Sequence, residues 1–365
     1  MVRVNRLVAL QLAAVMAAAA VAAAQSAAAP AARAVVAAPT VTTRELVGQR
    51  LMVAMGGTRP SPALLGRIRR GEVGGIILFG ANITGPSQLR ALTADLQSAA
   101  RAAGRPPLLI ATDQEGGRVR RLSWAGPVKS ATELGESSPA NIRRQGLLAG
   151  RALLAGGITV DLAPVADVPG PGSFMAADDR TFGPSAAAVG PAVTAFTRGL
   201  TAAKVVATAK HFPGIGRATS NTDSSLVEIR ASRDALESDL APFRAAIGAG
   251  VPMVMISNAS YPAFDSKPAP WSPRIQSLLR NELGFKGVTI TDALDGAAAT
   301  RRRTLPSVAV LSAQAGVDIL LFTGSEASSA AAYERLVAAA SEGRIPAAAL
   351  RRSYDRILAL KQAYH

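Results

Sequence analysis

Short apolar runs rich in β-branched residues alternate along this chain with longer alanine- and leucine-rich segments. Apolar runs without polar alternate positions are typical of parallel strands that are covered on both faces. The longer segments have helical spacing, so the pattern favours repeated strand–helix units. Strands are expected at residues 75–79, 108–112, 159–163, 205–209, 253–257, 288–291 and 317–322. Helices between them are expected to include residues 87–103, 141–155, 186–203, 232–249 and 272–283.

Polar side chains follow several of these runs, at the point where each strand is expected to end. A TIM barrel assembles its active site from the ends of several strands, whereas an open doubly wound sheet concentrates it at one switch point. The sequence therefore predicts a single-domain α/β protein of the (β/α)8 TIM-barrel type. No eighth strand is evident, which leaves an irregular barrel as an open alternative. The polar strand-end residues are Asp113, Asp167, Lys210, His211, Asn258 and Asp292.

The N-terminal segment has the pattern of an export signal. Arg3 and Arg6 precede an apolar run over residues 7–24, and small residues follow it. We expect a signal peptide over residues 1–28, with an uncleaved membrane anchor as the alternative. After cleavage no stable membrane span is expected, so the chain is predicted to be secreted or extracytoplasmic.

A flexible Ala/Pro leader is expected at residues 29–41, and the barrel domain at residues 42–365. Thr42–Glu45 resembles a helix start, and apolar residues continue at helical spacing as far as Met52. The chain contains no cysteine, which excludes disulfides and lipoprotein attachment through an N-terminal cysteine. The fold is therefore expected to depend on packing alone.

The formal net charge is +15, and most of the positive charge comes from arginine. In an exported protein this charge indicates residence near anionic cell-wall polymers or phospholipid head groups, with a generally arginine-rich composition as the alternative. Nucleic acid is not an expected partner, because no basic run is interleaved with aromatic residues and only 4% of the residues are aromatic.

The most specific motif is Lys210-His211-Phe212-Pro213-Gly214-Ile215-Gly216, directly after the apolar run 205–209. It brings a cation and an imidazole to the end of a strand, and the chain then enters a loop that carries Asp223. A second strand, 288–291, is followed at once by Asp292. Retaining hydrolysis of a glycosidic bond needs a carboxylate nucleophile, a proton donor and hydrogen bonds that hold the sugar. These residue types are suited to such a site.

Further segments accompany this motif, and in their order along the chain they resemble signatures of glycoside hydrolase family 3. The resemblance is to its single-domain β-N-acetylglucosaminidase (β-N-acetylhexosaminidase) branch and covers about residues 42–362. The segments are residues 112–122 (TDQEGGRVRRL), 161–167 (DLAPVAD), 179–183 (DRTFG) and 283–294 (LGFKGVTITDAL).

The resemblance implies a retaining enzyme that cleaves terminal β-linked N-acetylglucosamine or a related β-hexoside, with no metal or organic cofactor. Cell-wall glycan fragments are the implied substrates, as in peptidoglycan turnover. By this resemblance Asp292 is the nucleophile. The implied substrate contacts are Asp113, Arg121, Arg180, Lys210 and His211.

Each of these roles has a structural alternative. Asp292 could cap the following helix, although Asp295 is the better candidate for that cap. Arg180 could instead pair with the neighbouring Asp178 or Asp179. His211 could be a core histidine that bonds to backbone.

The loop departs from the family pattern at Ser225. The branch uses a loop histidine next to an aspartate as its proton donor; here Asp223 is present, but serine occupies the histidine position. Asp223, or Glu228 further along, could act as a carboxylic acid if burial raised its pKa. Alternatively, good leaving groups are cleaved without acid help, or the protein is an exported carbohydrate-binding pseudoenzyme.

Overall fold

The computed structural model describes residues 41–301 and 303–365. The predicted signal peptide and all but the last residue of the predicted leader lie outside these residues. The domain begins with helix α2 (Thr43–Gly48), which Thr42 and Glu45 open with a reciprocal capping box. The predicted helix start is therefore confirmed.

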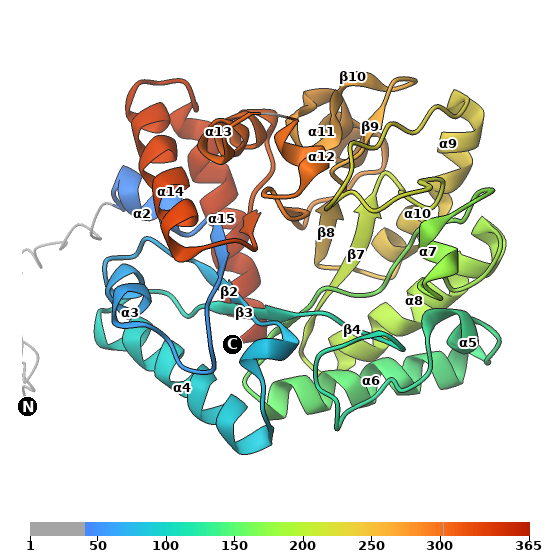
Figure 1. Cartoon of the computed structure of the whole chain (residues 1–365), viewed down its shortest axis with the longest axis horizontal. Helices are drawn as coiled ribbons and strands as arrows, with labels where there is room; N and C mark the ends of the chain where they lie inside the picture. Colours follow the sequence, from blue (N-terminus) through green and yellow to red (C-terminus); the bar gives the residue numbers. More distant parts are fainter. Residues whose placement is uncertain (1–40, 302) are drawn as a thin grey trace, which may run out of the picture. The chain divides into compact units, whose positions relative to one another are not determined.

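Eight parallel strands form a barrel in the order β11-β8-β7-β6-β3-β2-β1-β12 (Figure 1). The barrel closes between β11 and β12, where Thr291 N donates to Ile319 O (3.0 Å) and Ile319 N donates to Thr289 O (2.8 Å). The predicted (β/α)8 fold is confirmed. The strands are β1 (Leu51–Ala54), β2 (Gly75–Ile77), β3 (Leu109–Thr112), β6 (Val160–Asp161), β7 (Val206–Phe212), β8 (Met253–Ile256), β11 (Val288–Thr291) and β12 (Leu320–Phe322).

The eighth strand is β1, in a segment whose spacing predicted a helix as far as Met52. That prediction is wrong beyond Gly48, where α2 ends against another part of the chain: a Cβ on Gly48 would lie 1.8 Å from Gly71 O. β1 then pairs with β2 on one side and β12 on the other, so all four of its residues are buried. This segment is a strand because it pairs with strands that are distant from it in sequence.

Helices cover the outside of the barrel. The single helix expected at residues 232–249 is two helices, because Pro242 lacks an N–H group and cannot continue the preceding helix. The helix expected at 272–283 is α11 followed by a π-helical turn, η3 (Leu278–Glu282). The α-helices after α2 are α3 (Pro62–Arg69), α4 (Pro86–Ala102), α5 (Ala131–Gly135), α6 (Pro139–Ala155), α7 (Phe174–Ala177), α8 (Ala186–Ala202), α9 (Arg233–Asp239), α10 (Ala241–Gly248), α11 (Pro273–Ser277), α12 (Ala297–Thr300), α13 (Leu305–Ala315), α14 (Glu326–Ser341) and α15 (Ala347–Tyr364).

Small ribbons extend from the strand ends. β4 (Gln114–Gly116) and β5 (Val119–Arg120) form one antiparallel pair after β3, and β9 (Ser260–Tyr261) and β10 (Asp265–Pro268) form another after β8. The 3-10 turns are η1 (Gly80–Asn82) and η2 (Ala269–Trp271). These insertions add side chains to the carboxyl ends of the strands.

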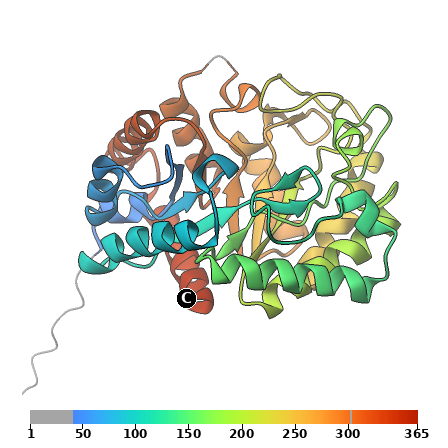
Figure 2. The same ribbon diagram turned by 60° about the horizontal axis from the view of Figure 1, so that its bottom comes forward.

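The last helix, α15, closes the opposite end of the barrel (Figure 2, red). Its Ile357 and Leu360 pack with inward-facing strand residues such as Met52 and Val206. Lys361 Nζ donates to Gln49 Oε1 (2.7 Å) and to Gly74 O (2.8 Å), just before β1 and β2 begin. The amino-terminal ends of the strands are thus covered, and the carboxyl ends are left open. Within the described residues, no helix has the length and apolar character to cross a membrane.

Candidate active site

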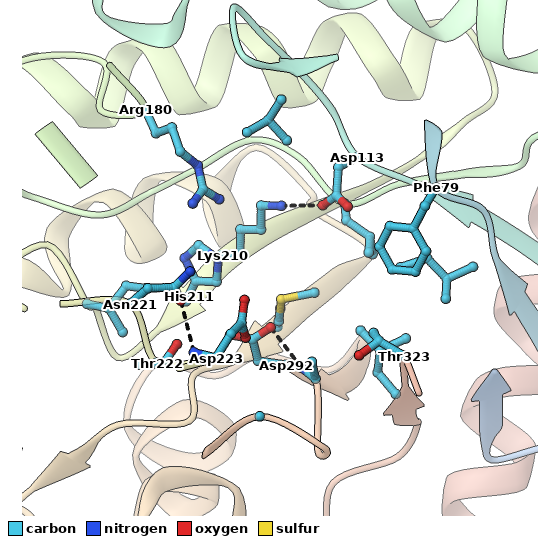
Figure 3. A pocket seen from close by; sticks show the side chains of 18 of the residues that line it. Phe79, Asp113, Arg180, Lys210, His211, Asn221, Thr222, Asp223, Asp292 and Thr323 are labelled. Carbon is cyan, nitrogen blue, oxygen red and sulfur yellow. Dashed lines mark hydrogen bonds and ion pairs between the residues drawn. The ribbon is translucent and has the colours of Figure 1, made fainter. Parts of the chain in front are cut away.

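A cavity of about 460 Å³ lies at the carboxyl ends of the strands (Figure 3). Inner strand residues such as Leu162 and Met255 form part of its apolar lining. The predicted nucleophile, the predicted substrate contacts and the candidate acid Asp223 all line this one cavity. They are Asp113, Arg121, Arg180, Lys210, His211, Asp223 and Asp292.

Lys210 lies near the end of β7 and is held by two carboxylates. Its Nζ lies 2.7 Å from Asp113 Oδ1 and 2.7 Å from Glu115 Oε1, and its side chain is only 3% exposed. Burial by itself would lower the pKa of Lys210, but Asp113 and Glu115 outweigh burial and raise it. Lys210 is therefore a charged hydrogen-bond donor at the cavity wall.

Glu115 also fixes Arg180, whose Nε and Nη2 donate to its two carboxylate oxygens at 2.9 and 2.8 Å. Arg180 therefore pairs with Glu115, and not with the neighbouring Asp178 or Asp179 as the alternative required. Burial opposes the charge on Glu115, but Arg180 and Lys210 keep its pKa well below the usual value. Two cations are thereby fixed by one carboxylate.

Arg121 is less constrained than Arg180. Its Nη2 lies 3.9 Å from Asp113 Oδ2, and 30% of its side chain is exposed. Asp113 therefore has one oxygen bonded to Lys210 and a second with only a long contact to Arg121. That second oxygen remains available to accept a hydrogen bond in the cavity.

His211 is oriented by a buried aspartate and not by backbone, so its structural alternative is wrong. Its Nδ1 lies 2.7 Å from Asp167 Oδ2, while Asp167 Oδ1 accepts from the backbone N–H groups of His211 (3.3 Å) and Ile215 (2.7 Å). A carboxylate at Nδ1 favours the tautomer with its proton there. Nε2 is then the ring nitrogen free to meet a ligand in the cavity.

Asp292 directly follows β11 and lines the cavity. Its Oδ1 accepts from Ala293 N (2.8 Å), and the N-cap of α12 is Gly296, so Asp292 does not cap that helix. Asp295 does not cap it either. Its two oxygens accept from Thr323 N (2.9 Å) and Thr323 Oγ1 (3.1 Å).

The loop after β7 brings Asp223 into the same cavity, close to Asp292 (Figure 3). The pKa of Asp223 is raised, first because the carboxyl is partly withdrawn from water and second because Asp292 carries a like charge. Glu228 does not line the cavity, and its Oε1 instead pairs with Arg230 Nη2 at 2.7 Å. Of the two candidate acids, only Asp223 is placed with the other site residues.

The chain was compared with known protein families and structures. Residues 42–360 match the family described as "Glycosyl hydrolase family 3 N terminal domain". This chain belongs to glycoside hydrolase family 3. It is therefore a glycosyl hydrolase by family, as its motifs predicted.

Relatives with known names agree with this family. A protein of Arthroderma benhamiae named "Uncharacterized secreted glycosyl hydrolase" is 38% identical over 89% of this chain and 95% of its own length. A "Beta-hexosaminidase" of Alkalilimnicola ehrlichii is 38% identical over 74% of this chain and 79% of its own.

Solved structures of the family have the same fold. The family 3 β-N-acetylglucosaminidase from a Paenibacillus species has a TM-score of 0.86 at 35% identity; the match covers 89% of this chain but 63% of that longer one. A β-N-acetylhexosaminidase from Beutenbergia cavernae has a TM-score of 0.82 at 33% identity, and the match covers 88% of this chain and 99% of that one.

Sequence reasoning assigned no role to several residues that build this family 3 site. Glu115 belongs to the segment 112–122, and its spacing of two residues from Asp113 is the sequence signal that it shares the site. Asp167 was noted at a strand end, but nothing in the sequence linked it to His211. Asp161 is fully buried, and burial raises its pKa to about 8; its Oδ1 accepts from Gln114 N (2.9 Å) and fixes the backbone next to Asp113.

Several carboxylates lie in or next to the cavity, but they do not converge on a common point. Among residues 41–301 and 303–365, no group of three or more His, Asp or Glu side chains is placed to hold a metal ion. The carboxylates Asp113, Glu115 and Asp167 are each committed to a cation or an imidazole. This arrangement is suited to holding hydroxyl groups and to proton transfer.

Proposed function

We propose that this family 3 enzyme is an exported retaining glycosidase that removes terminal β-linked N-acetylglucosamine or a related β-hexoside. The names of its relatives, beta-hexosaminidase and β-N-acetylglucosaminidase, support this substrate class. One observation carries the proposal: Asp292 and Asp223 share a cavity with the four polar groups of Asp113, Arg180, Lys210 and His211.

The polar groups would hold the sugar ring. Asp113 accepts hydrogen bonds from hydroxyls with its free oxygen, Lys210 and Arg180 donate, and Nε2 of His211 accepts. Because Glu115 and Asp167 already fix three of these side chains, little conformational entropy is lost when the sugar binds. The sugar is thereby oriented with its anomeric carbon toward Asp292.

In the first step Asp292 attacks the anomeric carbon, and the bond to the leaving oxygen breaks. Asp223 gives its proton to that oxygen, so the leaving group departs as a neutral alcohol. In the second step Asp223, now ionised, takes a proton from water, and the resulting hydroxide displaces Asp292 from the sugar. Two displacements return the original configuration.

Asp223 suits this role better than an ordinary surface aspartate would. The residue is exposed at the cavity, but desolvation of its carboxyl group and the charge of Asp292 both raise its pKa and favour its protonated form. Once Asp292 is esterified to the sugar, its charge no longer acts on Asp223, so the pKa of Asp223 falls and the group stays in the carboxylate form that the second step requires. The two carboxylates would thus alternate their roles without a histidine.

Export and cell-wall location form part of the same proposal. The N-terminal pattern, the name of the secreted Arthroderma relative and the net charge of +15 support them. Anionic wall polymers would concentrate such a cation near its substrate glycans, for instance in peptidoglycan turnover.

The first test measures hydrolysis of a nitrophenyl β-N-acetylglucosaminide by the purified protein. We expect release of nitrophenol with β-N-acetylglucosamine as the first-formed anomer, observed by NMR. Asp292→Ala is expected to lower kcat by at least ~10³-fold, as loss of a nucleophile does. Equal turnover by the variant and the parent would refute the nucleophile assignment.

The proton donor needs a separate test. Asp223→Asn is expected to slow phenyl glycosides by about 10²-fold or more and dinitrophenyl glycosides far less, because good leaving groups need no proton. Ser225→His is the complementary gain test. A large gain with phenyl glycosides would indicate that the donor function was lost with the histidine, and no gain would support Asp223 as its replacement.

A carbohydrate-binding pseudoenzyme is the second candidate, favoured only by the serine at position 225. It predicts that N-acetylglucosamine raises the melting temperature while no product forms during long incubation with any glycoside. Product release that depends on Asp292 would exclude it.

A further inference from the structure

The loop that carries Asp223 is fixed to the segment that carries Asp292. Asp223 O accepts from Ala297 N at 2.9 Å, and Thr222 O accepts from Ala298 N at 3.0 Å. Ala297 and Ala298 are the first two residues of α12, which has no side-chain cap. The first N–H groups of a helix need acceptors, and here the loop carbonyls provide them.

Gly296 makes this contact possible. A Cβ at this position would lie 3.1 Å from Ala293 O in the same turn and 3.3 Å from Asp223 Cα, both closer than side chains ordinarily pack, and 3.4 Å from Asp223 Oδ1. The backbone does not require glycine here, since φ is −63° and ψ is 151°. The close approach of Asp223 Cα and of Ala293 O is therefore the visible reason for a residue without a side chain.

The turn between Asp292 and α12 is itself braced on two sides. Asn258 Nδ2, after β8, donates to Ala293 O at 2.7 Å. Leu294 N donates to Leu321 O at 3.0 Å, and Asp295 binds Thr323 after β12. The ends of two strands, β8 and β12, thus fix the turn that holds Asp223.

The loop is also held from its own side. Asn221 Oδ1 accepts from Asp223 N at 2.9 Å, and Asn221 O accepts from Ser225 N at 3.0 Å. Further back, Arg217 pairs bidentately with Asp239 at 2.6 and 3.1 Å. The loop therefore meets α12 as a folded turn and not as an extended chain.

From these contacts we propose that Gly296 and the N-terminus of α12 are positioning elements that set the carboxyl of Asp223 relative to Asp292. The inference rests on the proposed role of Asp223 as proton donor. Proton transfer in a transition state depends on geometry within fractions of an ångström, so a small displacement of Asp223 costs rate only where the proton is needed.

Two variants disturb the contact in different ways. Gly296→Ala adds one methyl group between Ala293 O and Asp223. Ala297→Pro removes the N–H group that Asp223 O accepts, at the first helical position, where proline is well tolerated. Gly85→Ala is the matched control: Gly85 is also the N-cap of a helix, α4, and a Cβ there meets nothing within 4 Å.

The experiment compares kcat/KM for phenyl, nitrophenyl and dinitrophenyl β-N-acetylglucosaminides, together with melting temperatures. We expect Gly296→Ala and Ala297→Pro to lose about 10-fold with the phenyl substrate and less than about 2-fold with the dinitrophenyl substrate. Gly85→Ala should match the parent throughout. A merely structural role would lower kcat/KM equally for all three substrates.

Asp223→Asn is measured in parallel to separate the two proposals. If it shows no dependence on the leaving group, the donor assignment fails. Alternatively, the rate loss in Asp223→Asn depends on the leaving group while Gly296→Ala and Ala297→Pro slow all three substrates equally or slow none of them. In that case the positioning proposal fails and the donor assignment stands. A variant too unstable to assay by this comparison would count against a positioning role for its residue.

Discussion

The two ends of this barrel each bury a lysine, and the two lysines differ in their partners. Lys210, at the open end, lies between the carboxylates of Asp113 and Glu115, which raise its pKa. Lys361, at the end closed by α15, donates to the neutral oxygens of Gln49 and Gly74, and burial lowers its pKa to about 7. A buried lysine keeps its charge where counter-charges exceed the cost of desolvation.

Two aspartates show the same contrast. Asp318, near the closed end, accepts hydrogen bonds from Arg280 (2.6 Å), Thr289 N (2.9 Å), Ser353 (2.8 Å) and Arg356 (2.6 Å). Asp292 accepts one, from Ala293 N, and faces a cavity. The closed end uses its polar groups to hold the fold, whereas the open end leaves some of their hydrogen-bonding capacity for a ligand.

The largest effect should come from breaking the closed end. Asp318→Asn leaves Arg280 and Arg356 without their shared carboxylate and should cost about 3–5 kcal/mol of unfolding free energy, measured by chemical denaturation. Asp292→Asn should cost less than about 1 kcal/mol, because few internal bonds depend on it. Equal losses in the two variants would contradict the contrast between the ends.

The same substitution at Lys210 and at Lys361 allows the two ends to be compared by activity. Lys210→Met should lower kcat/KM for a nitrophenyl glycoside by about 10²-fold, because a charged donor is lost and Asp113 is left without its close cation, while Glu115 keeps only Arg180. Lys361→Met makes the same exchange at the other end and should leave kcat/KM unchanged. A similar decline in both variants would mean that Lys210 acts only through stability.

At the open end, the protonation of Asp223 should determine how enzymatic activity depends on pH. The raised pKa of Asp223 means that its protonated, donating form is lost only as pH rises through that higher value. We expect kcat for phenyl glycosides to fall by up to about 10-fold per pH unit above it. In Asp223→Asn this alkaline decline should vanish, and its persistence would assign the donor to another group.

At the closed end, the protonation of Lys361 should change the unfolding free energy with pH. This is the smallest of the four expected effects. With a pKa of about 7 folded and about 10.4 unfolded, Lys361 binds fewer protons in the folded state between these values, so unfolding free energy rises with pH across that window. Lys361→Met should remove about 1 kcal/mol of this rise between pH 7 and 8. An unchanged slope would mean that Lys361 stays charged when buried.

Several predictions needed no tertiary information. Seven strands are evident as apolar runs because both faces of a parallel strand are covered. The site residues could be named because each signature is contiguous in sequence, so the family resemblance is visible without the fold. The alternatives for Arg180 and His211, in contrast, could not be decided, since Glu115 and Asp167 lie 65 and 44 residues away from them.

The amino-acid sequence by itself determined the strand–helix order, the family and the candidate residues, because these depend on local patterns. Only the tertiary structure decided that residues 51–54 form the eighth strand, that α15 closes one end, and that Asp223 rests on α12 beside Asp292. Each of these depends on contacts between segments far apart in the chain, and no periodicity or motif within one segment encodes its distant partner.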